Sequence, residues 1–593
     1  MKQILTSVLL LSVAFQSWAL QPGDRVDNFK LLDQDGKMHE LYYYSDMDAV
    51  VIMIHGNGCP IVRNAVHEYK EVRDQFKGKN VQFLMLNAFI QDSRESIVKE
   101  AEEFSMDMPI LIDDTQLIAE SMGVVRTADV YVIDPKTWKL AYRGELSDRL
   151  GYETQRVSTE NPYAVDAINA TIAGKQPEVA FTEAKGCLVN LLEADKTEEH
   201  KQISYADEIA PILIDKCLTC HRDGGIGPFA MSDYNMIRGF APMIREVVRT
   251  KRMPPWHADP HVGEFSNDRS LSNEEQQTLV HWIEAGAPRG EGGDPLAEYK
   301  HDWPEWTLGE PDVIVEIPSF DVPAKGVVDY LNPTAENPLD EDVWVRAVEI
   351  LPGSRQALHH VITTFGKADP NNPRGIQAMG GLGGYVPGGR GEEFPEDTGV
   401  FLPKDAVFSF QMHYTTFGKP VTDTSRMGIY LHKKKPKYPL DSTVLLNPMI
   451  KIPANTKEYW AKRESKPLER DILVYTLLPH AHFRGKASNF VARYPDGREE
   501  VLLSVPNYDF NWQTTYHLEE PIQLPAGTVI VHNTAWDNSA QNPANPDPNR
   551  VVPWGLQSWD EMLFGSIKWR YVNPREGDTS SGLGVVEEEH PGS

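Results

Sequence analysis

Residues 49–76 read AVVIMIHGNGCPIVRNAVHEYKEVRDQF. The uninterrupted apolar run at 49–54 predicts a strand, and the mixed polar and apolar pattern at 61–76 predicts a helix. Cys59 and Pro60 lie between them, at the expected first turn of that helix. A sulfur in this position is close to free backbone N–H groups and to the positive end of the helix dipole, which both stabilise a thiolate.

Strands and helices alternate on the C-terminal side of this unit as well. Runs at 81–86 and 130–133 predict further strands, and 93–104 predicts a further helix. Together they indicate an α/β layered domain. The pattern resembles the thioredoxin-like redoxin (peroxiredoxin-related) family over roughly residues 22–173.

Two positions depart from that family. Val62 stands where a CxxC motif has its second cysteine, and Ala128 stands where the family usually carries a cis-proline. Cys187 could serve instead as a remote partner for Cys59. The pair could then be redox-active, with thiol peroxidase chemistry at Cys59 as one form. Alternatively, the two cysteines form a structural disulfide, or remain unlinked in a domain retained for docking.

A second cysteine motif spans residues 217–221. Its sequence, Cys217-Leu218-Thr219-Cys220-His221, matches the haem c attachment pattern, in which two thiols form thioethers and the imidazole reaches the iron. A zinc site is the main competitor, but the sequence has no second CxxC to complete one. The mostly helical segment 204–290 resembles a small cytochrome c domain.

The second axial ligand of such a haem has to come from downstream. Met253 is the best candidate, because the two prolines that follow it would hold its thioether rigidly. The competing candidates are Met231, Met243, His257 and His261. One thioether and one imidazole ligand favour electron transfer over oxygen binding.

Strand-like alternation between Pro, Gly and Asn turns predicts an all-β region from about residue 312 to 572. In a strand, residues i and i+2 face the same side, so His480 and His482 could bind one metal ion together. Adjacent His359 and His360 would normally face opposite sides, so joint binding with His413 requires a bulge, a turn or binding through different ring nitrogens.

The order of these motifs, followed by Asp560-Glu561-Met562, resembles the copper type II ascorbate-dependent monooxygenases, the peptidylglycine hydroxylating and dopamine β-monooxygenase family. The resemblance implies two β-sandwich (jelly-roll-like) domains. It implies an electron-donating copper held by His359, His360 and His413. It implies an oxygen-activating copper held by His480, His482 and Met562. These residue types agree with copper, because imidazoles accommodate both oxidation states and a thioether favours Cu(I).

Three positions depart from the peptide-hydroxylating members. The arginine that those enzymes carry two residues before the HxH motif is Leu478 here. The Asn and Tyr that they carry two and four residues after the copper methionine are Phe564 and Ser566. A peptidylglycine substrate is therefore not expected, and a less polar substrate pocket is.

Length and charge restrict the remaining possibilities. A chain of 593 residues suggests about four domains, and its net charge of −28 disfavours nucleic acid as a partner. Residues 1–19 resemble a secretory signal cleaved near Ala19, with an uncleaved anchor as the alternative. No later apolar run is long enough to span a membrane. We therefore expect a protein exported across the inner membrane. An exported c-type haem favours the periplasm as its compartment, with the outer surface as the alternative.

The sequence thus predicts a multidomain protein: an α/β thioredoxin-like domain, a mostly α cytochrome c-like domain and two all-β copper domains. The expected segments are 1–19 (signal), 20–175 (redoxin), 176–203 (linker), 204–290 (cytochrome c-like), 291–311 (linker), 312–437 and 438–572 (copper domains) and 573–593 (disordered tail).

The expected function is hydroxylation of a C–H bond by O₂, using two copper ions and one covalent haem c. The expected partners are a small or peptide-like organic substrate, O₂, and an electron donor, either a periplasmic carrier or an ascorbate-like reductant. The alternatives are a non-enzymatic haem and copper electron carrier or copper-binding protein, and a thiol peroxidase using Cys59.

Overall fold

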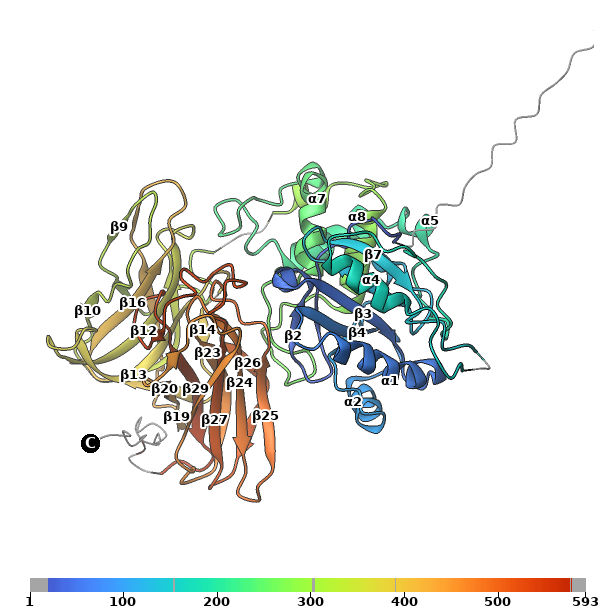
Figure 1. Ribbon diagram of the computed structural model, residues 1–593. Coiled ribbons are helices and arrows are strands. Elements are labelled where there is room, and N and C mark those ends of the chain that lie inside the picture. Colours follow the sequence, from blue (N-terminus) through green and yellow to red (C-terminus); the bar gives the residue numbers. More distant parts are fainter. Residues whose placement is uncertain (1–19, 153–154, 301–303, 390, 576–577, 579–593) are drawn as a thin grey trace, which may run out of the picture. The chain divides into compact units, whose positions relative to one another are not determined.

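The computed structural model describes residues 20–152, 155–300, 304–389, 391–575 and 578. The chain divides into two compact units, residues 1–197 and 198–593 (Figure 1). The predicted signal at 1–19 and most of the predicted tail lie outside the described residues. Among the helices that are described, none is both long and apolar enough to cross a membrane.

The first unit is built on a five-stranded sheet of order β5-β4-β3-β6-β7, in which β3, β4 and β5 are parallel and β6 and β7 are antiparallel to their neighbours. Its strands are β1 (Lys30–Leu32) and β2 (Met38–Glu40), which form a separate hairpin, and β3 (Ala49–His55), β4 (Val81–Asn87), β5 (Ile110–Ile112), β6 (Val130–Asp134) and β7 (Lys139–Gly144). Its helices are η1 (Leu41–Asp46), α1 (Pro60–Gln75), α2 (Arg94–Glu103), α3 (Leu117–Met122) and α4 (Tyr163–Ile172). The predicted thioredoxin-like α/β domain is confirmed.

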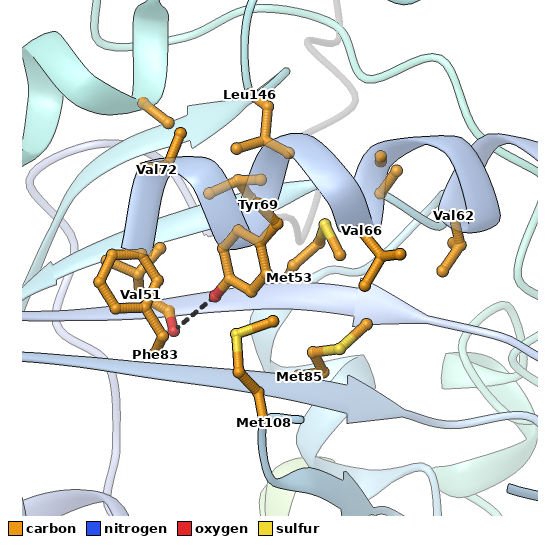
Figure 2. Packing of buried hydrophobic residues seen from close by; sticks show 14 of the residues in the cluster. Val51, Met53, Val62, Val66, Tyr69, Val72, Phe83, Met85, Met108 and Leu146 are labelled. Atoms are coloured by element: carbon orange, nitrogen blue, oxygen red, sulfur yellow. Dashed lines mark hydrogen bonds between the residues drawn. The ribbon is translucent and has the colours of Figure 1, made fainter. Parts of the chain in front are cut away.

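The central strand β3 is buried on both faces. Val51 and Met53 belong to the hydrophobic core beneath α1, whereas the alternate residues Val50 and Ile52 belong to the core on the opposite face. Figure 2 shows Tyr69 of α1 lying over β3, with its hydroxyl donating to the Val51 carbonyl at 3.1 Å. Burial on both faces explains why this strand is an uninterrupted apolar run.

The second unit begins with a set of helices. They are α5 (Thr197–His200), which starts at the division between the units, η2 (Tyr205–Ile209), α6 (Ala210–Lys216), α7 (Tyr234–Arg249), α8 (Asn273–Glu284) and α9 (Pro295–Glu298). At the start of α8, Ser272 and Glu275 each accept a hydrogen bond from the other's backbone N–H, which satisfies two otherwise free donors. The helical character of the segment agrees with the sequence, and its likeness to cytochrome c stays a prediction.

The loop at 256–269 of this helical segment packs against the all-β region. Phe265 forms a β-bridge with Leu518, and it belongs to the same hydrophobic core as the strands around it. The Trp256 ring lies against the Phe265 and Tyr516 rings, with centroids 5.9 and 5.0 Å apart. Buried aromatic area of this kind fixes the helical segment to the second half of the β region.

The all-β region contains two separate hydrophobic cores, each enclosed by sheets. The first sandwich pairs the sheet β10-β16-β12-β13 with the sheet β19-β15-β11-β18-β8, to which β14 is added. The strands of this half are β8 (Val313–Glu316), β9 (Phe320–Val322), β10 (Thr334–Glu336), β11 (Val343–Leu351), β12 (Leu358–Ala368), β13 (Ile376–Tyr385), β14 (Glu392–Glu393), β15 (Thr398–Leu402), β16 (Val407–Tyr414), β17 (Val421–Asp423), β18 (Arg426–Leu431) and β19 (Tyr438–Pro439).

The second sandwich pairs the sheet β20-β29-β23-β26 with the sheet β22-β27-β24-β25. Its strands are β20 (Asp441–Asn447), β21 (Lys451–Ile452), β22 (Tyr459–Glu464), β23 (Ile472–His480), β24 (Gly485–Arg493), β25 (Glu499–Val505), β26 (Tyr516–Leu524), β27 (Val529–Trp536), β28 (Val552–Pro553) and β29 (Leu563–Tyr571). The predicted all-β region is confirmed.

Candidate functional site

The first histidine set lies on two neighbouring strands of the first sandwich. His359 and His360 are on β12, His413 is on β16, and His360 is the Cα partner of His413. The register between these strands shifts between Leu358 and His360. An irregularity of this kind allows adjacent histidines to face the same side.

The three imidazoles converge through the same ring atom. The Nδ1 atom of His360 lies 3.2 Å from Nδ1 of His359 and 3.3 Å from Nδ1 of His413. Nitrogen ligands about 2.0–2.1 Å from a metal ion in tetrahedral array are about 3.3 Å apart. All three side chains are buried, and the donor set therefore fits a divalent or monovalent transition-metal ion.

Burial also keeps these imidazoles uncharged. It lowers the pKa of His359 to about 4, and together with the neighbouring histidines it lowers the pKa of His413 to about 2. The pKa of His360 lies well below its ordinary value for the same two reasons. Neutral imidazole is the form that binds a metal ion, so the set is ready to bind one at neutral pH.

The second set comes from neighbouring strands of the second sandwich. His480, the last residue of β23, is the Cα partner of Phe564 in β29. His482 follows His480 by two residues and Met562 precedes Phe564 by two, so both lie just beyond the paired ends of these strands. All three predicted ligands are buried.

The protonation state of His480 is fixed by its partner. The Gln513 amide nitrogen donates to the Phe510 carbonyl, so its oxygen faces His480 and accepts from Nδ1–H at 2.7 Å. This leaves Nε2 of His480 as the available ligand atom. Burial lowers the pKa of His480 to about 4. Both ring nitrogens of His482 are buried without a hydrogen-bond partner among the described residues, so either nitrogen fits the role of a metal ligand.

The buried side chain of Glu561 connects the two segments that carry the second set of predicted ligands. Glu561 accepts hydrogen bonds from the backbone N–H groups of His482 at 2.8 Å, Arg484 at 2.6 Å and Met562 at 3.3 Å. It also accepts from Nε1–H of Trp536 at 2.9 Å. One side chain therefore fixes the HxH segment relative to the methionine.

The two histidine sets adjoin one another. The ring centroids of His360 and His480 are 6.4 Å apart. The Tyr330 ring lies 5.5 Å from the His360 ring and 5.9 Å from the His482 ring, and Phe510 likewise contacts a histidine of each set, at 5.4 Å from His413 and 6.1 Å from His482. The rings of Tyr330 and Phe510 thus each contact both histidine sets.

The CxxCH motif follows α6 directly. His221 is mostly buried, and its Nδ1–H donates to the Phe229 carbonyl at 3.1 Å, which leaves Nε2 available to an iron ion. A Cβ atom on Gly227 would come within 2.8 Å of the His221 Nδ1 atom, so this position needs glycine. The geometry of His221 fits a haem ligand whose tautomer is fixed by the backbone.

The sulfurs of this motif lie partly against the first sandwich. A Cβ atom on Gly388 would come within 2.7 Å of the Cys220 Sγ atom. Burial raises the pKa of Cys217 to about 12 and also raises that of Cys220, as expected for thiols in an apolar site. Met253 is half-buried in the loop after α7, and its role as second axial ligand stays a prediction.

In the first unit, the two remaining cysteines meet. The Sγ atoms of Cys59 and Cys187 are 2.8 Å apart, although 128 residues separate them in the chain. Thr127, next to the position of the family's proline, lies between them: its hydroxyl is 3.0 Å from Cys59 Sγ. The structure therefore supports the interpretation in which Cys187 is the remote partner of Cys59.

His55, the last residue of β3, is buried. From its surroundings we predict that the stability of the first unit depends on pH. Asn87 donates to Nδ1 of His55 at 3.0 Å, and its orientation is fixed because it also donates to Asp92. His55 is therefore neutral, and burial lowers its pKa to about 4. The unfolded chain takes up this proton below about pH 6.5. The contribution of His55 to the free energy of unfolding is therefore fully present above that pH, and it is lost as the pH falls toward 4.

The shift of the His55 pKa from 6.5 to about 4 corresponds to about 3 kcal/mol of unfolding free energy. The measurement is urea unfolding between pH 7 and pH 4, followed by hydrogen exchange in the peptides of β3 and α1. In a His55→Gln variant this part of the pH dependence should disappear. An unchanged pH profile in that variant would assign the effect to another group.

Several residues of the site were not predicted from the sequence. Tyr330 and Phe510 come from loops of different sandwiches, and nothing in their local pattern marks them. Gln513 has no motif either. Glu561 could have been found, because it immediately precedes the expected ligand Met562 and an acidic residue beside a buried ligand needs hydrogen-bond donors.

Known families and proteins are similar to parts of the chain. The family model described as "AhpC/TSA family" matches residues 22–144. A human protein named DBH-like monooxygenase protein 2 is 28% identical over 166 residues, a match that covers 25% of this chain and 33% of that protein. The chain thus matches about a third of the length of this curated relative.

Solved structures match at low TM-scores. A hypothetical protein SMc02350 from Sinorhizobium meliloti 1021 is 21% identical, with a TM-score of 0.27, and the match covers 29% of this chain and 94% of that one. A conserved protein from Geobacillus kaustophilus is 28% identical, with a TM-score of 0.26, over 29% and 93% of the two chains. These scores carry no argument about the site. The sequence comparisons thus show likeness to the AhpC/TSA family over residues 22–144 and a partial likeness to one DBH-like monooxygenase.

Proposed function

We propose that the second unit is a copper-dependent monooxygenase, which inserts one oxygen atom of O₂ into a C–H bond of an organic substrate and releases the other as water. The observation that carries this proposal is the convergence of three Nδ1 atoms in a buried cluster, beside an HxH pair that Glu561 links to Met562 through backbone hydrogen bonds. The partial likeness to a DBH-like monooxygenase supports it.

The donor sets suit two dissimilar copper sites. The first offers three imidazoles and the second offers two imidazoles and a thioether, the combination that favours Cu(I). Bound copper would supply the one-electron chemistry that activation of O₂ requires. The chain's own residues hold the ligands: Gln513 fixes the tautomer of His480, and Glu561 fixes His482 relative to Met562.

The proposal includes an in-chain haem c at Cys217, Cys220 and His221 as the source of single electrons. Its support is the contact between Cys220 and Gly388. Gly388 follows Tyr385 by three residues, and Tyr385 is the Cα partner of Val361 in β12, the strand that carries His359 and His360. The haem motif is therefore close to the histidine set proposed to receive electrons.

The surroundings of the second set favour an apolar substrate. Phe564 lies against His480 with ring centroids 5.8 Å apart, and Leu478 stands where an arginine would bind a carboxylate. Tyr330 and Phe510 add aromatic surface beside both sets. A hydrophobic or aromatic C–H substrate is consistent with these side chains.

Copper loading tests the two-site proposal without knowledge of the substrate. Reduced full-length protein should bind two copper ions per chain, and X-ray absorption should show a sulfur ligand at one of them. Met562→Ala should remove the sulfur signal, whereas the matched control Met449→Ala, at an exposed methionine of the same sandwich, should retain it. Binding of only one copper ion per chain would contradict the proposal. So would a sulfur signal that is unchanged in Met562→Ala.

A further inference from the structure

A turn of the first sandwich lies against the CxxCH motif. It comprises residues 386–389, directly after β13, and the Gly389 N–H donates to the Val386 carbonyl at 2.8 Å. Gly388 has a φ of +74°, and a Cβ atom there would come within 2.7 Å of Cys220 Sγ and 3.3 Å of the Arg269 Nη1 atom. Glycine is the residue that combines this backbone conformation with this close approach. The turn is therefore fitted to the Cys220 sulfur.

The backbone of Cys220 is fixed from within the motif as well. Its carbonyl accepts a hydrogen bond from the Gly227 N–H at 2.9 Å, and a Cβ atom on Gly225 would come within 2.3 Å of the same carbonyl oxygen. That Cβ atom would also lie 3.1 Å from the Arg222 Cγ atom. Close packing thus holds both Cys220 and the first part of the Arg222 side chain in place.

Three arginines gather around Cys220. Burial raises the pKa of the Cys220 thiol, and the charges of Arg269 and Arg222 counteract this rise. Arg355, in the turn between β11 and β12, lies beside the Tyr385 phenol, where its charge counteracts the burial that raises the pKa of Tyr385 to about 12. Burial and the nearby Arg355 lower the pKa of Arg222. The cluster therefore combines residues of the haem motif with residues of the first sandwich.

The other sulfur of the motif has the opposite electrostatic surroundings. Burial, Cys220 and the carboxylates of Asp215 and Glu275 all raise the pKa of Cys217. Positive charge is therefore concentrated on the Cys220 side of the motif. This concentration stands out in a chain whose net charge is −28.

We propose that the first sandwich completes the haem site through the turn at 386–389, and that the charges of Arg355, Arg222 and Arg269 beside Cys220 raise the reduction potential of the haem. This inference rests on the proposed function, because it requires a haem attached through Cys217 and Cys220. Arg355 is a positioning residue in this account: it acts on the haem through its charge and forms no bond to it.

The expected sign follows from simple electrostatics. A haem attached to Cys220 has one edge beside this sulfur, because the thioether is a covalent bond. Ferric haem carries one more positive charge than ferrous haem, so fixed positive charge nearby favours the ferrous state. The effect is larger where burial lowers the local dielectric constant. A raised potential allows a mild one-electron reductant to reduce the haem.

Spectroelectrochemical titration of the full-length, haem-attached protein measures this potential. In Arg355→Gln the ratio of reduced to oxidised haem, at a fixed electrode potential near the wild-type midpoint, should fall at least about threefold. Arg355→Lys keeps the charge and should keep most of the ratio. Arg346→Gln is the matched control, because Arg346 lies in the same sandwich and pairs with Glu393 at the surface. An unchanged ratio in Arg355→Gln, or an equal fall in Arg355→Lys, would overturn the proposal.

A second pair of variants tests the turn itself. Gly388→Ala should also lower the ratio, because the added methyl group pushes the first sandwich away from Cys220 and leaves the CxxCH motif unchanged. Gly239→Ala, on α7 with no atom within 4 Å of the added Cβ, is the control and should match wild type. A wild-type ratio in Gly388→Ala would refute the role of the turn.

Haem attachment is measured separately, by the mass of the intact protein and by its pyridine haemochrome spectrum. A chain without covalent haem would overturn the haem of the proposed function, and this inference with it. An attached haem whose potential does not respond to Arg355 would overturn this inference alone.

Discussion

Replacing Glu561 by alanine will lower the unfolding free energy of the second sandwich by about 3–5 kcal/mol. The change removes a fully buried acceptor and leaves the donors of His482, Arg484, Trp536 and Met562 unsatisfied. Each buried donor left without a partner costs about 1–3 kcal/mol, and relaxation of the cavity reduces the sum. The effect is large because a single side chain serves four groups.

Urea unfolding with hydrogen exchange in the peptides of β23 and β29 measures this loss. Glu561→Gln keeps one acceptor oxygen, and we expect it to lose about 1–3 kcal/mol. Trp536→Phe removes one of the four hydrogen bonds together with part of a fully buried ring, so its loss sets an upper limit for a single hydrogen bond. A loss below about 1 kcal/mol in the alanine variant would show that water replaces the carboxylate.

His360→Ala will reduce the copper content of the loaded protein from two ions to one. His360 is the central member of the first set, since its Nδ1 atom is the one in contact with those of both His359 and His413. Replacing a residue that only hydrogen-bonds to a metal ligand weakens metal binding by about 10–100-fold. We therefore expect the loss of His360 itself to weaken binding by more than this factor. The haem should still be reduced by an external donor.

Copper analysis after dialysis, together with haem absorbance during reduction, measures both quantities. His432→Ala is the matched control, because His432 is a histidine of the same sandwich whose Nε2–H donates to the Thr398 carbonyl and that takes no part in the cluster. It should retain two copper ions. Retention of two ions by His360→Ala would remove this residue from the site.

The sequence predicted the parts of the site that are local in the chain. The HxH motif needs only the two-residue period of a strand. The adjacency of His359 and His360 indicated an irregular strand as one route to joint binding, and the register shift after Leu358 is such an irregularity. The strand, cysteine and helix at 49–76 were likewise predictable, because each depends on neighbouring residues.

The parts that depend on distant residues were not predictable. The contact between Cys59 and Cys187 requires the tight approach of Gly186 to Thr127, which no local pattern encodes. The closeness of His360 and His480 depends on how two sandwiches pack, and Tyr330 and Phe510 reach the site from separate loops. Tertiary packing, rather than propensity, decides such contacts.

Oxygen uptake tests the central proposal most directly. The copper-loaded, haem-containing protein is supplied with a reductant and candidate apolar substrates, and wild type is compared with Met562→Ala, His480→Ala and the control Met449→Ala. We predict uptake in wild type and in the control, and its loss in the other two variants while the haem is still reduced. The contradicting result is that haem and copper are reduced and reoxidised, but no oxygen uptake depends on Met562 or His480. That result would indicate an electron carrier and not a monooxygenase.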